Sequence, residues 1–177
     1  MILENEINLI KDEEIKKATK EFIIKYEDKI KEQPTSLSGK YHTKDPIVEI
    51  HLKRAVWFAD KFCLEFNIKN EQRDVIIAAT LLHDIGNYEC SEKNNRNLPF
   101  FWPATNWGRT RDIKLHPLDA KDLILNSKMK RAEDIGRLVA CHMSHWYNNC
   151  PQPRQLDEYI ICASDYFASR EEVDVIL

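Results

Sequence analysis

Two adjacent side chains that commonly bind metal ions, His83 and Asp84, follow an apolar run without a charge at residues 75–82. A run that is apolar at nearly every position predicts a helix that is buried on all sides. Gly86 stands where a glycine often ends a helix, so the pair is expected in the last helical turn. Burying an imidazole and a carboxylate there is costly unless something charged binds them. The pair therefore indicates a site for a cation.

Further candidate ligands are distributed along the chain, whose six histidines are His42, His51, His83, His116, His142 and His145. His51 and His142 fall on apolar helical stripes, and Asp165 is surrounded in the sequence by apolar residues. One divalent cation, or two, can satisfy several inward-facing imidazoles together with two carboxylates. Mixed nitrogen and oxygen donors of this kind favour Mn, Fe, Ni, Co or Zn over Ca, with Mg also possible.

The elements that carry these residues are predicted to be helices, because no segment shows a sustained alternation of apolar and polar residues. The expected helices cover residues 11–33, 46–66, 71–85, 118–126, 131–146 and 155–170. We predict an all-α fold that forms a single domain over residues 1–177. The N-terminal helix, within residues 1–33, is expected to pack on or beside the bundle. Residues 87–114 are expected to form an irregular loop with many aromatic side chains.

The composition limits the classes of function. A formal net charge of −3 argues against a general binder of nucleic acid or of membrane surfaces. Five cysteines without a Cys-x-x-Cys spacing suit reduced thiols better than a framework of disulfides. The first residues lack the basic and apolar segments of a signal peptide, and no apolar run reaches membrane-spanning length. We therefore expect a cytoplasmic protein with no membrane partner, whose oligomeric state stays open.

The order of the candidate ligands resembles the pattern H…HD…H…H…D of the HD superfamily of metal-dependent phosphohydrolases. Leu-Leu-His-Asp-Ile-Gly at residues 81–86 resembles the central signature of that family. His-Pro-Leu-Asp-Ala at 116–120 and Ala-Ser-Asp-Tyr-Phe-Ala at 163–168 resemble later ligand segments. The resemblance spans roughly residues 38–170. It implies an HD-domain-like helical bundle with the metal site between the central helices.

The resemblance also implies roles for individual residues. The first metal would be held by His51, His83, Asp84 and Asp165. A second metal would be completed by His116 and His142, with Asp84 as the bridge. A bound divalent metal lowers the pKa of water from 15.7 to about 7, which provides hydroxide for attack on phosphorus. Asp84 or Asp165 would orient that hydroxide, and His116 or His145 would act as the acid toward the leaving group.

The expected substrate is a phosphoester, and two departures from the family pattern bear on which one. Asn87 occupies the position where the family often has a phosphate-binding lysine. As substrate-binding residues we therefore consider Asn87, Arg54, Arg109, Arg111 and Lys114. Together with the aromatic side chains of the 87–114 loop they favour a nucleotide or another small phosphorylated molecule. The second departure is the lack of a Gly-Tyr-Pro segment after His142, which removes support for the cyclic-di-GMP phosphodiesterase branch.

Several alternatives stay open at this point. The same six ligands are similar to those of the diiron oxygenases in this superfamily, such as the myo-inositol oxygenase type. A non-catalytic module that senses a nucleotide is a third hypothesis. Individually, His116 could lie in a surface turn, His142 could be a hydrogen-bonded core histidine, and His145 could sit at a helix rim. The aromatic residues of the loop could simply pack over an edge of the bundle.

Overall fold

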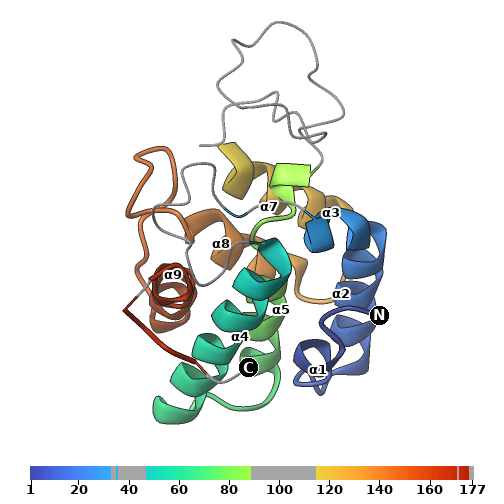
Figure 1. The fold of residues 1–177 in the computed structure, drawn as a ribbon, viewed down its shortest axis with the longest axis horizontal. Helices are drawn as coiled ribbons and strands as arrows, with labels where there is room; N and C mark the ends of the chain where they lie inside the picture. The colour runs from blue at the N-terminus through green and yellow to red at the C-terminus, as the bar shows by residue number, and fades with distance from the viewer. Residues whose placement is uncertain (33–34, 36–46, 89–114, 171, 176–177) are drawn as a thin grey trace, which may run out of the picture.

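The computed structural model describes residues 1–32, 35, 47–88, 115–170 and 172–175, and these residues form helices without a strand. The helices are α1 (Glu4–Ile7), α2 (Glu13–Lys25), α3 (Glu27–Glu32), α4 (Val48–Glu65), α5 (Asn70–Leu82), α7 (His116–Asn126), α8 (Ala132–Cys141) and α9 (Leu156–Ala168). Figure 1 shows them arranged as a bundle. The all-α prediction is confirmed. Among the described helices, none is long and apolar enough to cross a membrane.

Helix α5 is the central element of the bundle. Its residues are buried without interruption from Asp74 to Leu82, as the apolar run predicted. Helices α1, α2, α4, α8 and α9 all pack against it, so that it lies in the middle of the bundle in Figure 1. Because α5 contacts helices from both halves of the chain, its C-terminal end is a point at which distant segments can meet.

The N-terminal segment differs from the single helix predicted over residues 11–33. Tyr26 has φ −112° and ψ 15°, which ends α2 and separates it from α3. The side chain of Asp12 caps α2 by accepting hydrogen bonds from the backbone of Glu14 and Ile15. The backbone N–H of Asp12 in turn donates to the buried carboxylate of Asp74 at 2.8 Å. This contact ties the start of α2 to the central helix.

The end of the central helix also differs from expectation. Helix α5 ends at Leu82, and His83 to Ile85 form a turn instead of a last helical turn. Gly86 is therefore not a helix cap. A Cβ atom on Gly86 would lie 2.0 Å from the carbonyl oxygen of His116 and 2.7 Å from the backbone nitrogen of Ala120. The absence of a side chain lets the first turn of α7 approach the segment that carries His83 and Asp84.

A buried arginine fastens the end of the chain to α4. Arg54 is 3% exposed. Its guanidinium donates to the carbonyl oxygen of Ala168 at 2.8 Å, of Arg170 at 3.2 Å and of Val173 at 2.9 Å. Nε and Nη2 of Arg54 are thus bound to backbone at and after the end of α9, and a contact of Arg54 with a substrate phosphate stays a prediction. Arg54 holds α9 against α4, and these two helices carry Asp165 and His51.

Replacing Arg54 by methionine is expected to destabilise the fold by about 2–4 kcal/mol, because several buried carbonyl groups lose their donor. Chemical denaturation measures this loss. The metal content of the folded fraction should stay the same as in the unmodified protein. An unchanged free energy of unfolding would contradict the anchoring role.

Candidate metal centre

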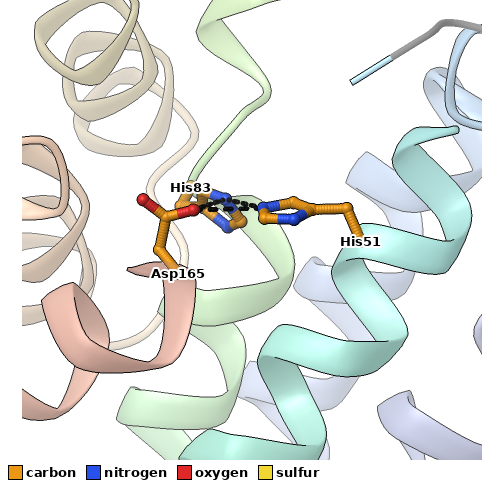
Figure 2. Close-up of side chains that lie close together, drawn as sticks. All are labelled: His51, His83 and Asp165. Atoms are coloured by element: carbon orange, nitrogen blue, oxygen red, sulfur yellow. Dashed lines mark hydrogen bonds and ion pairs between the residues drawn. The ribbon is translucent and has the colours of Figure 1, made fainter. Parts of the chain in front are cut away.

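One group of ligand atoms joins three separate helices. The Nε2 atom of His51, on α4, lies 3.2 Å from Nε2 of His83, at the end of α5. Oδ1 of Asp165, on α9, lies 3.1 Å from Nε2 of His51 and 3.7 Å from Nε2 of His83. Figure 2 shows the three side chains pointing toward one another from their helices. Two imidazole nitrogens and a carboxylate oxygen thus face a common point.

A second group lies next to the first. Nε2 of His116, the first residue of α7, is 3.0 Å from Nε2 of His142, which follows α8. Asp84 connects the two groups through its two carboxylate oxygens. Oδ1 of Asp84 lies 3.3 Å from Nε2 of His116, and Oδ2 lies 3.4 Å from Nε2 of His83. All six predicted metal ligands are therefore brought together from five helices and the turn after α5.

Two of the imidazoles are oriented by the helices that they terminate. His83 and His142 are the C-caps of α5 and α8. In each, Nδ1 lies 2.7 Å from the carbonyl oxygen three residues earlier, that of Thr80 or of Val139. The last carbonyls of a helix lack a helical donor, and a carbonyl can only accept, so Nδ1 carries the proton. Nε2 of both rings is left facing the site. In the sequence, each of these two histidines directly follows a segment of buried apolar residues, and this pattern indicated that both rings lie inside the bundle.

The protonation states suit a cation. Burial would raise the pKa of Asp165, but the hydrogen bond with His51 and the nearby His83 lower it to about 2. Burial would likewise raise the pKa of Asp84, whereas the surrounding imidazoles, His83 foremost, hold it well below its ordinary value. Burial lowers the pKa of His142 to about 3, with a further contribution from the adjacent histidines. Both carboxylates are thus ionised and His142 is neutral at neutral pH, as metal ligands must be.

The spacing of the donor atoms fits a divalent metal. With metal–ligand bonds of about 2.1 Å, neighbouring ligand atoms are about 3.0 Å apart in octahedral and about 3.4 Å apart in tetrahedral coordination. The contacts within the two groups range from 3.0 to 3.7 Å. In two sets of three residues, the ligand atoms all lie within 4.8 Å of one another, close enough to hold one ion. These sets are His51 with His83 and Asp165, and His83 with Asp84 and His142. The residues present therefore fit a divalent metal.

Comparison with protein families identifies the architecture around this centre. The family model described as HD domain matches residues 48–170, which is more than half of the chain and includes all six ligand residues. The chain belongs to the HD domain family. Comparison with curated proteins and with solved structures gave no match. HD domains bind divalent metals, and most members of the family are metal-dependent hydrolases.

Asn87 of this HD domain contacts Asp84, and its predicted contact with substrate stays a prediction. Its Nδ2 donates to Oδ1 of Asp84 at 2.9 Å. Its backbone N–H also donates to the carbonyl oxygen of Asp84 at 2.9 Å, within the turn that follows α5. Asn87 therefore fixes the orientation of the carboxylate that connects the two ligand groups. The replacement of a lysine at this position did not by itself point to that role.

Replacing Asn87 by alanine is expected to weaken metal binding or activity by about 10- to 100-fold, because an outer partner of a metal-binding carboxylate is lost. Titration of the metal-free protein with Mn²⁺ or Zn²⁺, followed by calorimetry, measures this change. Asn126, exposed at the end of α7, offers a matched control in which the same replacement leaves the metal affinity unchanged. Equal affinities for the two variants would argue against the role of Asn87.

Of the remaining predicted site residues of the HD domain, the structure describes only His145. Helix α8 ends at Cys141 and not at residue 146, and residues 142–146 form turns. His145 is consequently exposed, and its ring lies edge-on to that of Tyr166 with centroids 6.3 Å apart. Arg109, Arg111, Lys114 and the loop from residue 89 onward lie outside the described residues, as does His42.

Proposed function

We propose that this HD domain is a metal-dependent phosphohydrolase that cleaves a phosphoester of a small molecule, with a nucleotide as the preferred substrate. The observation that carries the proposal is the position of Asp84, whose two carboxylate oxygens face different ligand groups. This arrangement supports two adjacent metal positions with Asp84 as the bridge. Two metals that lie close together suit phosphoryl chemistry because they can contact both the attacking and the leaving oxygen.

The two aspartates of the ligand set are more exposed than the histidines. The side chains of His51, His83, His116 and His142 are between 1% and 5% exposed. The side chains of Asp84 and Asp165 are 18% and 13% exposed. When bound, a divalent metal supplies a Lewis acid for the phosphoryl oxygens and lowers the pKa of a coordinated water. The two partly exposed carboxylates would accept a proton from water and orient it toward phosphorus.

Two histidines were candidates for the acid that protonates the leaving oxygen. Nε2 of His116 faces Asp84 and His142 within the ligand group, so that this nitrogen serves as a metal ligand. We assign the proton donor to His145, which follows the candidate ligand His142 by three residues and has an exposed imidazole, a group that commonly acts as a general acid. Arg109, Arg111 and Lys114 remain our proposed contacts to the substrate phosphate.

The cytoplasm is the proposed location. The four described cysteines, Cys63, Cys141, Cys150 and Cys162, are free thiols. Free buried thiols support a reducing compartment, where nucleotides and other small phosphorylated molecules are available as substrates.

Metal analysis followed by a substrate screen tests the proposal. The purified protein is analysed for Mn, Fe, Co, Ni, Zn and Mg, stripped of metal and reloaded with each ion. Phosphate release is then measured with nucleotides, sugar phosphates and phosphodiesters. We expect release that depends on one of these ions and on its concentration. Two iron ions per chain with oxygen uptake and no phosphate release would support the oxygenase instead. Thermal stabilisation by a nucleotide without turnover would support the sensing module.

A further inference from the structure

Two buried thiols lie in contact between helices α8 and α9, which pack side by side (Figure 1). Cys141 is the last residue of α8 and Cys162 lies in the middle of α9, and the two residues are 1% and 2% exposed. Their Sγ atoms are 4.0 Å apart, and Sγ of Cys162 donates to the carbonyl oxygen of Cys141 at 3.1 Å. Neither thiol belongs to the ligand set. We call these two side chains the thiol pair.

The backbone joins each member of the thiol pair to a metal ligand. Cys141 is bonded directly to His142, and Cys162 lies about one helical turn before Asp165. Because residues three apart share a helix face, Cys162 and Asp165 lie on the same face of α9. His142 belongs to one ligand group and Asp165 to the other. A covalent change at the thiol pair therefore acts on both ligand groups.

The separation of the two sulfur atoms suits a disulfide that forms after a limited movement. An S–S bond is about 2.0 Å long, so the Sγ atoms have to approach by about 2 Å from their separation of 4.0 Å. Rotation of the side chains supplies part of this movement, and the close packing of buried residues transfers the rest to the backbone of α8 and α9. A metal site tolerates changes in ligand distance of only about 0.2 Å. Closure of the bond is thus expected to disturb the positions of His142 and Asp165.

We propose that the thiol pair is a site of reversible oxidation by hydrogen peroxide, and that its disulfide weakens metal binding at the adjacent centre. The sulfur of one thiol attacks a peroxide oxygen, the O–O bond breaks, and the thiol proton leaves with the displaced hydroxide as water. The second thiol then attacks the sulfur of the resulting sulfenic acid. The S–S bond forms, the S–O bond breaks and a second water leaves. The two thiols together supply the two electrons that reduce the peroxide.

The turns after α8 give the oxidant a route to the thiol pair. Residues 142–150 contain no helix, and Oγ of Ser144 lies 3.7 Å from Sγ of Cys162. Segments outside the core helices open locally at a lower cost in free energy than the core does, so opening of these turns exposes the sulfur atoms. In a reducing compartment such disulfides are transient and serve redox sensing. This behaviour agrees with the proposed cytoplasmic location.

Peptide mapping of the folded, metal-free protein tests the bond itself. The protein is treated with hydrogen peroxide, the remaining thiols are alkylated, and the peptides are compared before and after reduction with dithiothreitol. A cross-link between the peptides that contain Cys141 and Cys162, reversed by dithiothreitol, is the expected result. Circular dichroism checks that the oxidised protein is folded. Oxidation without a bond between these two residues would overturn the proposal.

Calorimetric titration with Mn²⁺ tests the effect of the bond on the metal centre. We expect the oxidised protein to bind Mn²⁺ roughly 10- to 100-fold more weakly, as when a metal ligand loses its supporting contacts. Dithiothreitol should restore the affinity, which separates the disulfide from oxidation of methionine, a change that needs an enzyme for its reversal. Equal affinities of the reduced and the cross-linked protein would overturn the proposed control of metal binding. Neither measurement uses a substrate, so the outcome is independent of the proposed phosphohydrolase function.

Cys141→Ala and Cys150→Ala are the matched variants. Cys141→Ala removes one sulfur of the thiol pair, so peroxide should leave its affinity for Mn²⁺ unchanged. Cys162→Ala removes the other sulfur and repeats the test if Cys141→Ala does not fold. Cys150 is 4% exposed and ends the same run of turns, so Cys150→Ala removes a buried thiol but keeps the pair. It should form the cross-link and lose affinity as the unmodified protein does. A loss of Mn²⁺ affinity in peroxide-treated Cys141→Ala, or no cross-link in Cys150→Ala, would overturn the assignment to this pair.

Discussion

Replacement of Asp84 by asparagine is expected to lower the rate of metal-dependent phosphate release by about a thousandfold or more. The two carboxylate oxygens of Asp84 face His83 and His116 at 3.4 and 3.3 Å. An amide keeps the shape but has only one acceptor oxygen and no charge, so it cannot serve both metal positions. We expect the metal content of the variant to fall by at least one ion per chain. Phosphate release and elemental analysis measure the two effects.

Asp122→Asn provides the control for this substitution. Asp122 is exposed on α7, so the same chemical change occurs outside the ligand groups and should leave turnover within twofold, as is usual for surface substitutions. Circular dichroism should show that both variants retain their helices. Full turnover by purified Asp84→Asn would refute the proposed function, because no metal-bridging residue would then be required.

Gly86→Ala is expected to destabilise the protein by about 3 kcal/mol or more. The added Cβ would lie 2.0 Å from the carbonyl oxygen of His116, 2.7 Å from the backbone nitrogen of Ala120 and 2.9 Å from the carbonyl carbon of His116. All three atoms belong to backbone, so a side-chain rotation cannot relieve the overlap. Helix α7 must then move away, and His116 moves with it. We expect a lower denaturation midpoint together with weaker binding of the second metal.

Gly136→Ala supplies the contrasting case. Gly136 lies within α8, and the nearest atom to an added Cβ is Cγ of Lys121 at 3.3 Å, on a flexible side chain. Alanine at a helical position restricts the unfolded chain and favours the helix, so the change should be neutral or stabilising by about 0.4–1 kcal/mol. Chemical denaturation of both variants gives the comparison. Equal effects at the two glycines would contradict the close approach of α7.

The helices and the ligands were predictable because they depend on patterns within one segment. An apolar run long enough for a buried helix identified α5, and histidines or aspartates within apolar stripes identified His51, His142 and Asp165. The helix ends were less predictable. Helices α5 and α8 end where an imidazole donates to one of the last carbonyl groups of the helix, at His83 and His142. The helical periodicity of apolar residues does not reveal that competition.

The contacts that the sequence did not predict involve, for the most part, distant segments of the chain. Arg54 donates to carbonyl groups 114 to 119 residues later in the chain, so its position one turn after His51 suggested an orientation that the C-terminal segment changes. The function of Gly86 likewise depends on a backbone that approaches from α7. Asn87 was assigned to substrate from a comparison with the family lysine, whereas its amide is held by Asp84. A single sequence gives the chemical capacity of such residues but not their partners.

The hydrogen bonds from His83 and His142 to their own helices have a further consequence for metal exchange. Each ring is aimed by a carbonyl group that belongs to the folded helix, at 2.7 Å, and no metal is needed to set it. The conformational entropy of these two side chains is therefore lost when the bundle folds and not when the ion binds. An incoming ion therefore meets two imidazoles that are already oriented, so that exchange of one divalent metal for another requires no rotation of these rings.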